Sequence, residues 1–130
     1  MLGGGLVGAI ALMIVEVPWH DQLFGDYYRS IPYIVRAEPD FTAPSIAFLL
    51  RGLVMSAVYP LVYRSGSPFT NGLLFGIVIG LLTGLYWAPS YYAQRPIPAA
   101  APWLLLEDAF FLVQGAAGGL AIAMVHGRSA

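Results

Sequence analysis

The chain has 130 residues, the length of a single domain, and 58% of them are hydrophobic while only 10% are charged. Its formal net charge of −1 provides no basic face for nucleic acid, so that class of partner is excluded. Because the chain contains no cysteine, disulfides and thiolate metal sites are excluded as well.

Four apolar stretches follow one another along the chain, each about as long as the ~20 residues that a helix needs to cross a bilayer. They span residues 2–19, 44–63, 68–88 and 102–125. Pro44, Pro68 and Pro102 mark the starts of the last three, because the first turn of a helix tolerates proline. We predict an all-α fold, an integral membrane four-helix bundle with up-down-up-down topology, in one transmembrane domain over residues 1–130.

The first loop has a helical pattern of its own. Within residues 20–32, apolar side chains recur at helical spacing at Leu23, Phe24, Tyr27, Tyr28 and Ile31. We predict a short helix that lies in the membrane interface until Pro32 ends it. The alternative is a lid over a site beneath it.

The orientation of the chain in the membrane is predicted from the distribution of its arginines and the lengths of its loops. Arg64 and Arg128 lie on the side of the two termini, whereas Arg29, Arg36 and Arg95 lie in the longer loops on the other side. The first stretch lacks a positive region before it and a cleavage site after it, so we expect it to be retained. We expect a multi-pass protein of the inner membrane with cytoplasmic termini, because the terminal side has short connections and no acids.

Aromatic residues gather at the end of the bundle that carries the longer loops. Trp19, Trp87 and Trp103 stand at predicted helix ends there, with Tyr27, Tyr28, Tyr33, Tyr91 and Tyr92 close by. Amphipathic rings of this kind are enriched at the level of the lipid headgroups, which is the interpretation we favour.

Glycines recur every four residues in the predicted helices, in the pattern typical of a glycine zipper. They are Gly72, Gly76, Gly80 and Gly84 in the third stretch, Gly115 and Gly119 in the fourth, and Gly4 and Gly8 in the first. Small residues at this spacing let two helix backbones approach closely. We expect these ridges to pack on a neighbouring helix of the same chain, with a second copy or another membrane subunit as the alternative partner.

Polar side chains inside the spans are costly unless they face the bundle interior, a partner or water. We predict that they form a polar or binding cluster in one leaflet, made of Glu16, His20, Arg51, Glu107, Asp108 and Gln114. Arg51 is expected to pair with one or two of the three acids, because its charged fork fits a carboxylate. An acid left over would stay protonated or bind a cation.

Helical spacing suggests a path through this cluster. Glu16 and His20 are four residues apart and share one helix face. Glu107 and Gln114, seven residues apart, share a face of the fourth helix. A polar path from His20 past Glu16 towards Glu107 and Gln114 is therefore geometrically possible.

Three functional interpretations stay open. The favoured one is a non-enzymatic accessory, scaffold or binding subunit of the membrane, in which charges and glycines serve packing. The second is a proton-coupled small-molecule carrier or ion-conducting oligomer, with Glu16 or Asp108 as the titrating group. The third is a membrane enzyme that holds a metal with carboxylates and His20, ligands that suit divalent transition metals. We assign no catalytic and no metal-binding residue, and the cofactor is unknown.

The layout resembles that of the small uncharacterised four-helix proteins of bacterial inner membranes. The resemblance rests on the Trp19-His20 segment with Tyr27-Tyr28 in the first loop, and on the later glycine-rich helix that contains Gly76 and Gly80. It covers most of the chain and implies a membrane location without a known activity.

The chain also resembles the small multidrug transporters in its length, its four-helix layout and the acid of its first helix, Glu16. It departs from them at Arg51 and at the Glu107-Asp108 pair, which have no obvious counterparts there. Beyond these features the match fails, because the aromatic and proline signatures expected in the later helices are not evident.

Overall fold

The computed structural model describes residues 1–31 and 40–127, and every regular element within these ranges is a helix. The elements are α1 (Leu2–Val17), the π-helix η1 (Pro18–Leu23), α2 (Gly25–Ser30), α3 (Thr42–Val62), α4 (Pro68–Gln94) and α5 (Ala100–Gly127). Pro32, Tyr33, Arg36 and Arg128, which entered the sequence predictions, lie outside the described residues.

Four helices are long and apolar enough to cross a membrane: Leu2–Leu23, which joins α1 and η1, and the helices α3, α4 and α5. By length and composition, the chain is a small multi-pass four-helix membrane protein. The helices extend beyond some predicted bounds, most clearly in α4, which runs to Gln94 instead of residue 88.

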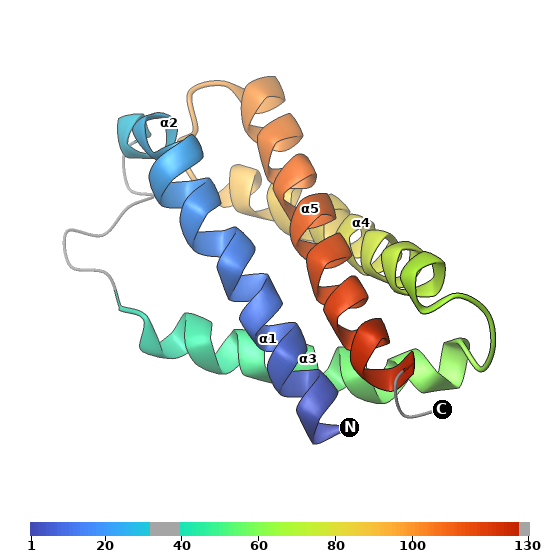
Figure 1. Cartoon of the computed structure of the whole chain (residues 1–130). Coiled ribbons are helices and arrows are strands. Elements are labelled where there is room, and N and C mark those ends of the chain that lie inside the picture. Colours follow the sequence, from blue (N-terminus) through green and yellow to red (C-terminus); the bar gives the residue numbers. More distant parts are fainter. Residues whose placement is uncertain (32–39, 128–130) are drawn as a thin grey trace.

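The helices pack in a definite order, because α1 contacts both α3 and α5, and α5 packs most extensively on α4 (Figure 1). Contact between α3 and α5 is smaller. Thus α3 and α4, although consecutive along the chain, pack mainly on different helices. The start of α1 and the end of α5 lie at the same end of the molecule in Figure 1.

The first membrane-spanning helix changes its winding at Pro18. This residue has no backbone N–H to donate, and the helix continues from it as η1 with a wider turn. The N–H of Phe24 donates to the carbonyl of Trp19, five residues back, at 3.0 Å. Such π-type turns rotate the side chains that follow and are frequent at functional sites.

The predicted interfacial segment is divided between two elements. Residues 18–23 continue the first span as η1, and α2 is a separate short helix. Tyr28 and Ile31 are buried, with 3% and 5% of their surface exposed. The apolar positions found in the sequence therefore face protein, at least at these two residues.

Aromatic rings at this end of the molecule form a packed cluster. Its buried members are Tyr28, Ile31, Ile97 and Trp103, and Trp19, Phe24, Tyr27, Tyr91 and Tyr92 pack against them. Trp103 is only 1% exposed, whereas Trp87 is 36% exposed. The rings of this cluster thus cover the end of α5 that carries Glu107.

Glycines bring α4 and α5 together. A Cβ atom at Gly76 would meet the carbonyl oxygen of Gly115, and one at Gly80 would meet the carbonyl oxygen of Phe111. Gly119 in turn lies against the backbone of Gly72 and Gly76. Because backbone atoms cannot move aside, these positions exclude any side chain larger than hydrogen.

The contact between α1 and α3 depends on a glycine that the sequence pattern did not single out. A Cβ atom at Gly52 would collide with the carbonyl oxygen of Gly5. On the same helix α1, Gly8 faces Ile122 of α5 and Gly4 faces Ser56 of α3. Small residues therefore allow α1 to lie close to both of its neighbours.

Candidate functional site

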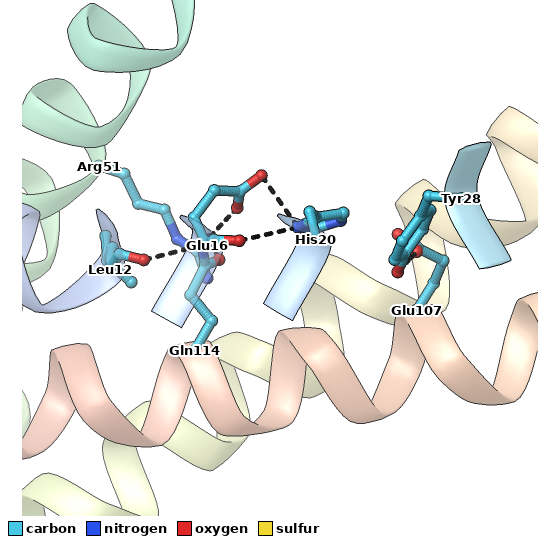
Figure 2. A network of polar contacts seen from close by, with 7 residues as sticks. All are labelled: Leu12, Glu16, His20, Tyr28, Arg51, Glu107 and Gln114. Carbon is cyan, nitrogen blue, oxygen red and sulfur yellow. Dashed lines mark hydrogen bonds and ion pairs between the residues drawn. The ribbon is translucent and has the colours of Figure 1, made fainter. Parts of the chain in front are cut away.

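The centre of the polar site is Gln114 of α5, whose side chain is 1% exposed (Figure 2). Its Nε2 donates to Oε2 of Glu16 at 3.0 Å and to the carbonyl of Leu12 at 3.3 Å. Its Oε1 accepts a hydrogen bond from Nη1 of Arg51 at 2.7 Å. The chemistry of the partners fixes the orientation of the amide, because arginine only donates and carboxylates and carbonyls accept.

Gln114 thus connects three helices by its side chain alone. Leu12 and Glu16 belong to α1, Arg51 to α3 and Gln114 to α5. Since α1 lies between the other two helices, a rotation of any one of them by a single residue would break at least one of these hydrogen bonds. The arrangement sets the register of the three helices.

The Glu16–His20 pair extends the network towards the aromatic end. Nδ1 of His20 lies 3.1 Å from the backbone carbonyl of Glu16 and 3.4 Å from Oε1 of its carboxylate. Both neighbours are acceptors, so Nδ1 carries a proton. About a third of the Glu16 side chain (33%) and 27% of that of His20 are exposed. Both side chains of this pair are therefore only partly buried.

The expected ion pair between Arg51 and an acid is wrong for the described residues. The ion pairs found within 4.0 Å there are Glu16–His20 and Asp26–Arg29. The amide of Gln114 stands between Arg51 and Glu16 and bonds to both, so that it separates the two charges. Nη2 of Arg51 is buried and has no hydrogen-bond partner among the described residues.

Glu107, 1% exposed, has a different partner from the one predicted. The hydroxyl of Tyr28 in α2 donates to its Oε1, so an acid of the fourth span is bound by the first loop (Figure 2). Burial raises the pKa of the Tyr28 phenol well above its usual value, and the hydrogen bond to Glu107 acts in the same direction. The phenol therefore stays a donor over the physiological pH range.

His20 stands between the two parts of the site. Its ring centroid lies 4.5 Å from that of Tyr28 and 4.6 Å from that of Phe110, the latter edge to face. The η1 turn at Pro18 carries His20 into this position. The path from Glu16 towards Glu107 therefore passes over aromatic rings and is not a continuous chain of hydrogen bonds.

Asp108 lies apart from the other members of the predicted cluster. Its Oδ1 would be 2.8 Å from a Cβ atom at Gly84, which places the carboxylate between α5 and α4. That oxygen is buried and has no hydrogen-bond partner in the described parts of the chain. The next residue after Glu107 thus points to another helix, as expected from the ~100° turn between neighbours in a helix.

Within residues 1–31 and 40–127, no group of three or more histidine, cysteine, aspartate or glutamate side chains lies close enough to hold a metal ion. Glu107 is bound to Tyr28 and Asp108 faces α4, so neither joins Glu16 and His20. The carboxylate-histidine metal site of the third interpretation therefore has no support in these residues.

A second polar contact lies at the other end of the bundle. Oγ of Ser56, which is fully buried, donates to the carbonyl of Met1 at 2.9 Å and lies 3.0 Å from Nε2 of His126. A hydroxyl has one proton, so Nε2 of His126 must be the donor in its contact with Ser56. Because the histidine donates, it does not activate this serine as a nucleophile.

Sequence reasoning missed the role of Tyr28 and the Ser56–His126 contact. Tyr28 and Glu107 are 79 residues apart, and Ser56 and His126 are 70 apart. Spacing within one helix carries no information about such pairs. The one available signal was the apolar pattern of the first loop, which placed Tyr28 on a face that packs against something.

Comparison with known proteins yields no relative: no family model, no curated protein and no solved structure matches this chain.

Proposed function

We propose that this protein is a non-enzymatic accessory or scaffold subunit of the inner membrane, with its spans held in register by the network around Gln114. The observation that carries the proposal is that the buried amide of Gln114 bonds to α1 twice and to α3 once. Both heteroatoms of this side chain are used within the protein. An amide whose hydrogen bonds are all made within the protein suits a structural role better than a binding role.

The proposed topology is up-down-up-down, with both termini in the cytoplasm and α2 at the membrane interface. The proposal is supported by the four spans and by the start of α1 and the end of α5, which lie at one end of the molecule (Figure 1). Tyr27 and Trp87, which are partly exposed beside the aromatic cluster, suit the headgroup level.

The proposed partner is first of all the lipid bilayer. Large apolar side chains are exposed along α3 and α4, at Leu50, Val54, Leu61, Val78, Leu82 and Leu85 among others. Contact with a second copy or another membrane subunit through the glycine ridges stays a prediction. Because the ridges of α4 and α5 face each other within the chain, such a partner would have to displace that contact.

The proposal is tested by combining stability with proton flux. Gln114→Leu should lower the free energy of unfolding in detergent by about 1–3 kcal/mol, because the part-buried side chains of Arg51 and Glu16 lose their partner. Val113→Leu, at a neighbouring position that is 48% exposed, is the control and should leave stability unchanged. In vesicles that enclose a pH-sensitive dye, the wild type and Glu16→Gln should both leak protons no faster than protein-free vesicles.

A proton-coupled carrier is the second candidate, favoured by one observation. The Glu16–His20 pair remains partly exposed, so protons from outside the protein could reach it. Proton flux in wild-type vesicles that Glu16→Gln abolishes would establish this function and reject the accessory proposal. Unchanged stability of Gln114→Leu would reject the structural role of the network.

A further inference from the structure

A cavity of about 570 Å³ opens at the end of the molecule that holds the termini, far along α5 from Glu107. It lies where α3 ends, α4 begins and α5 ends, and it is lined chiefly by Tyr59, Tyr63, Arg64, Asn71 and His126. Its volume falls within the about 300–1,000 Å³ of sites that bind small molecules. None of its residues belongs to the network around Gln114, although His126 also contacts Ser56.

The lining combines cationic and neutral donors with aromatic walls. Arg64 is an exposed cation, and no described residue of the lining is acidic. The ring of Tyr59 lies 5.5 Å from that of Tyr63 and 5.6 Å from that of His126. Hydrogen-bond donors surround the charge of Arg64, and no carboxylate of the described lining neutralises it. Such a lining favours an anionic ligand.

The loop that carries Arg64 is held in place by its own contacts. The side-chain amide of Asn71 donates to the carbonyl of Ser65 at 2.8 Å, and the N–H of Asn71 donates to the carbonyl of Ser67 at 2.9 Å. Gly66 adopts a φ of 102°, which other residues rarely tolerate. The cavity is therefore preformed, so that binding does not have to order the loop.

The position of the cavity narrows the class of ligand. The span α3 ends at Val62, and the span α4 begins at Pro68. The loop between them therefore lies at the depth of the lipid headgroups. Anionic groups at that depth are mainly phosphodiesters, and arginine binds phosphate with two parallel hydrogen bonds. The volume leaves room for a glycerol unit beside the phosphate, against the rings of Tyr59 and Tyr63.

We propose that this cavity binds a phosphate ester at the membrane surface, with Arg64 pairing the phosphate and the tyrosine rings contacting the organic part. The headgroup of an anionic phospholipid and a soluble phosphate ester share this chemistry. The proposal is independent of the accessory function, because it uses other residues at the other end of the bundle.

Native mass spectrometry of the full chain in neutral detergent tests the proposal with three probes: phosphatidylglycerol, phosphatidylcholine and glycerol 3-phosphate. Arg64→Gln should weaken the binding of phosphatidylglycerol about fivefold to tenfold, since one charge-assisted contact is lost at an exposed site. Arg64→Lys should keep most of the affinity. The matched control is Arg95→Gln, at an exposed arginine outside the cavity lining, which should bind as the wild type does.

The outcomes distinguish the two possible ligands, the headgroup of a phospholipid and a soluble phosphate ester. Arg64-dependent binding of phosphatidylglycerol, with weaker binding of phosphatidylcholine, supports a lipid headgroup. Arg64-dependent binding of glycerol 3-phosphate alone supports a soluble ester. Equal effects of Arg64→Gln and Arg95→Gln, or no effect of Arg64→Gln on any probe, would overturn the proposal.

Discussion

The hydrogen bond from Tyr28 to Glu107 ties the first loop to the fourth span. Its energetic weight comes from burial, because both side chains are at most 3% exposed and water cannot replace the lost partner. Among the described residues, the phenol of Tyr28 is the hydrogen-bond partner found for the carboxyl group of Glu107. The pKa of that phenol is raised, which makes the contact sensitive to alkaline pH.

Tyr28→Phe should lower the stability of the folded protein at pH 8. The variant should, however, lose less stability than the wild type does when the pH is raised further. The phenol ionises near its ordinary pKa of 10.0 in the unfolded chain and above it in the folded protein. Below pH 10.0 the wild type therefore keeps all of the stabilisation that comes from the raised pKa of the Tyr28 phenol. Above pH 10.0 it loses up to about 1.4 kcal/mol of that stabilisation per pH unit. Phenylalanine has no such linkage. Thermal melts in detergent from pH 8 to 11 measure both effects.

The control for this experiment is Tyr86→Phe, because Tyr86 is 75% exposed. Its melting temperature should follow that of the wild type at every pH. Parallel curves for the wild type and Tyr28→Phe across the whole range would show that the phenol of Tyr28 is not protected from ionisation.

Individual helices contribute to the fold through their small residues and their irregular turns. The α4–α5 pair has glycine on both helices, so backbone lies on backbone over several turns. Dispersion contacts between closely packed backbones are a main source of helix association in lipid, where the hydrophobic effect is absent. Pro89 inside α4 does not end the helix, and the hydroxyl of Ser90 donates to the carbonyl of Tyr86 at 2.6 Å in the same turn.

Gly76→Ala should destabilise the protein by about 1–3 kcal/mol, because the added methyl group collides with the carbonyl of Gly115 and forces α4 and α5 apart. The matched control is Gly3→Ala in α1, where a Cβ atom has nothing within 4 Å. That variant should be as stable as the wild type or slightly more so. Unfolding in a single detergent at fixed lipid content compares the two. A Gly76→Ala protein as stable as Gly3→Ala would mean that α4 and α5 are less closely packed.

For the whole molecule, the order in which the helices pack differs from their order along the chain. α1 lies between α3 and α5, and α4 packs mainly on α5 (Figure 1). The two polar regions therefore lie at different ends: the network of Gln114 towards the aromatic end, and the cavity of Arg64 at the end with the termini. The proposed topology assigns these ends to opposite faces of the membrane.

The absence of cysteine makes this topology directly measurable with single-cysteine variants. Ser65→Cys, in the loop between α3 and α4, should react with an impermeant maleimide only from the cytoplasmic side. Ala99→Cys, in the loop before α5, should react only from the opposite side. Both positions are exposed in the protein. If Ser65→Cys reacted only from the outside and Ala99→Cys only from the cytoplasm, the orientation would be the reverse of the proposed one. If both cysteines reacted from the same side, the up-down-up-down arrangement would be rejected.

The sequence by itself determined the class of protein and the number and approximate positions of its spans. Four long apolar stretches can satisfy their backbone groups in lipid only as helices, so composition and length were sufficient. Helical spacing also identified Glu16 and His20 as neighbours, because they are one turn apart on a single helix.

Only the tertiary structure decided which side chains meet across helices. It paired Arg51 with Gln114 instead of an acid, bound Glu107 to Tyr28 and left Asp108 against Gly84. The physical reason is that these contacts depend on how neighbouring helices are rotated about their axes. Close approach at Gly52, the wide turn after Pro18 and the packing order of the helices set that rotation, and none of them follows from the spacing of residues within a single helix.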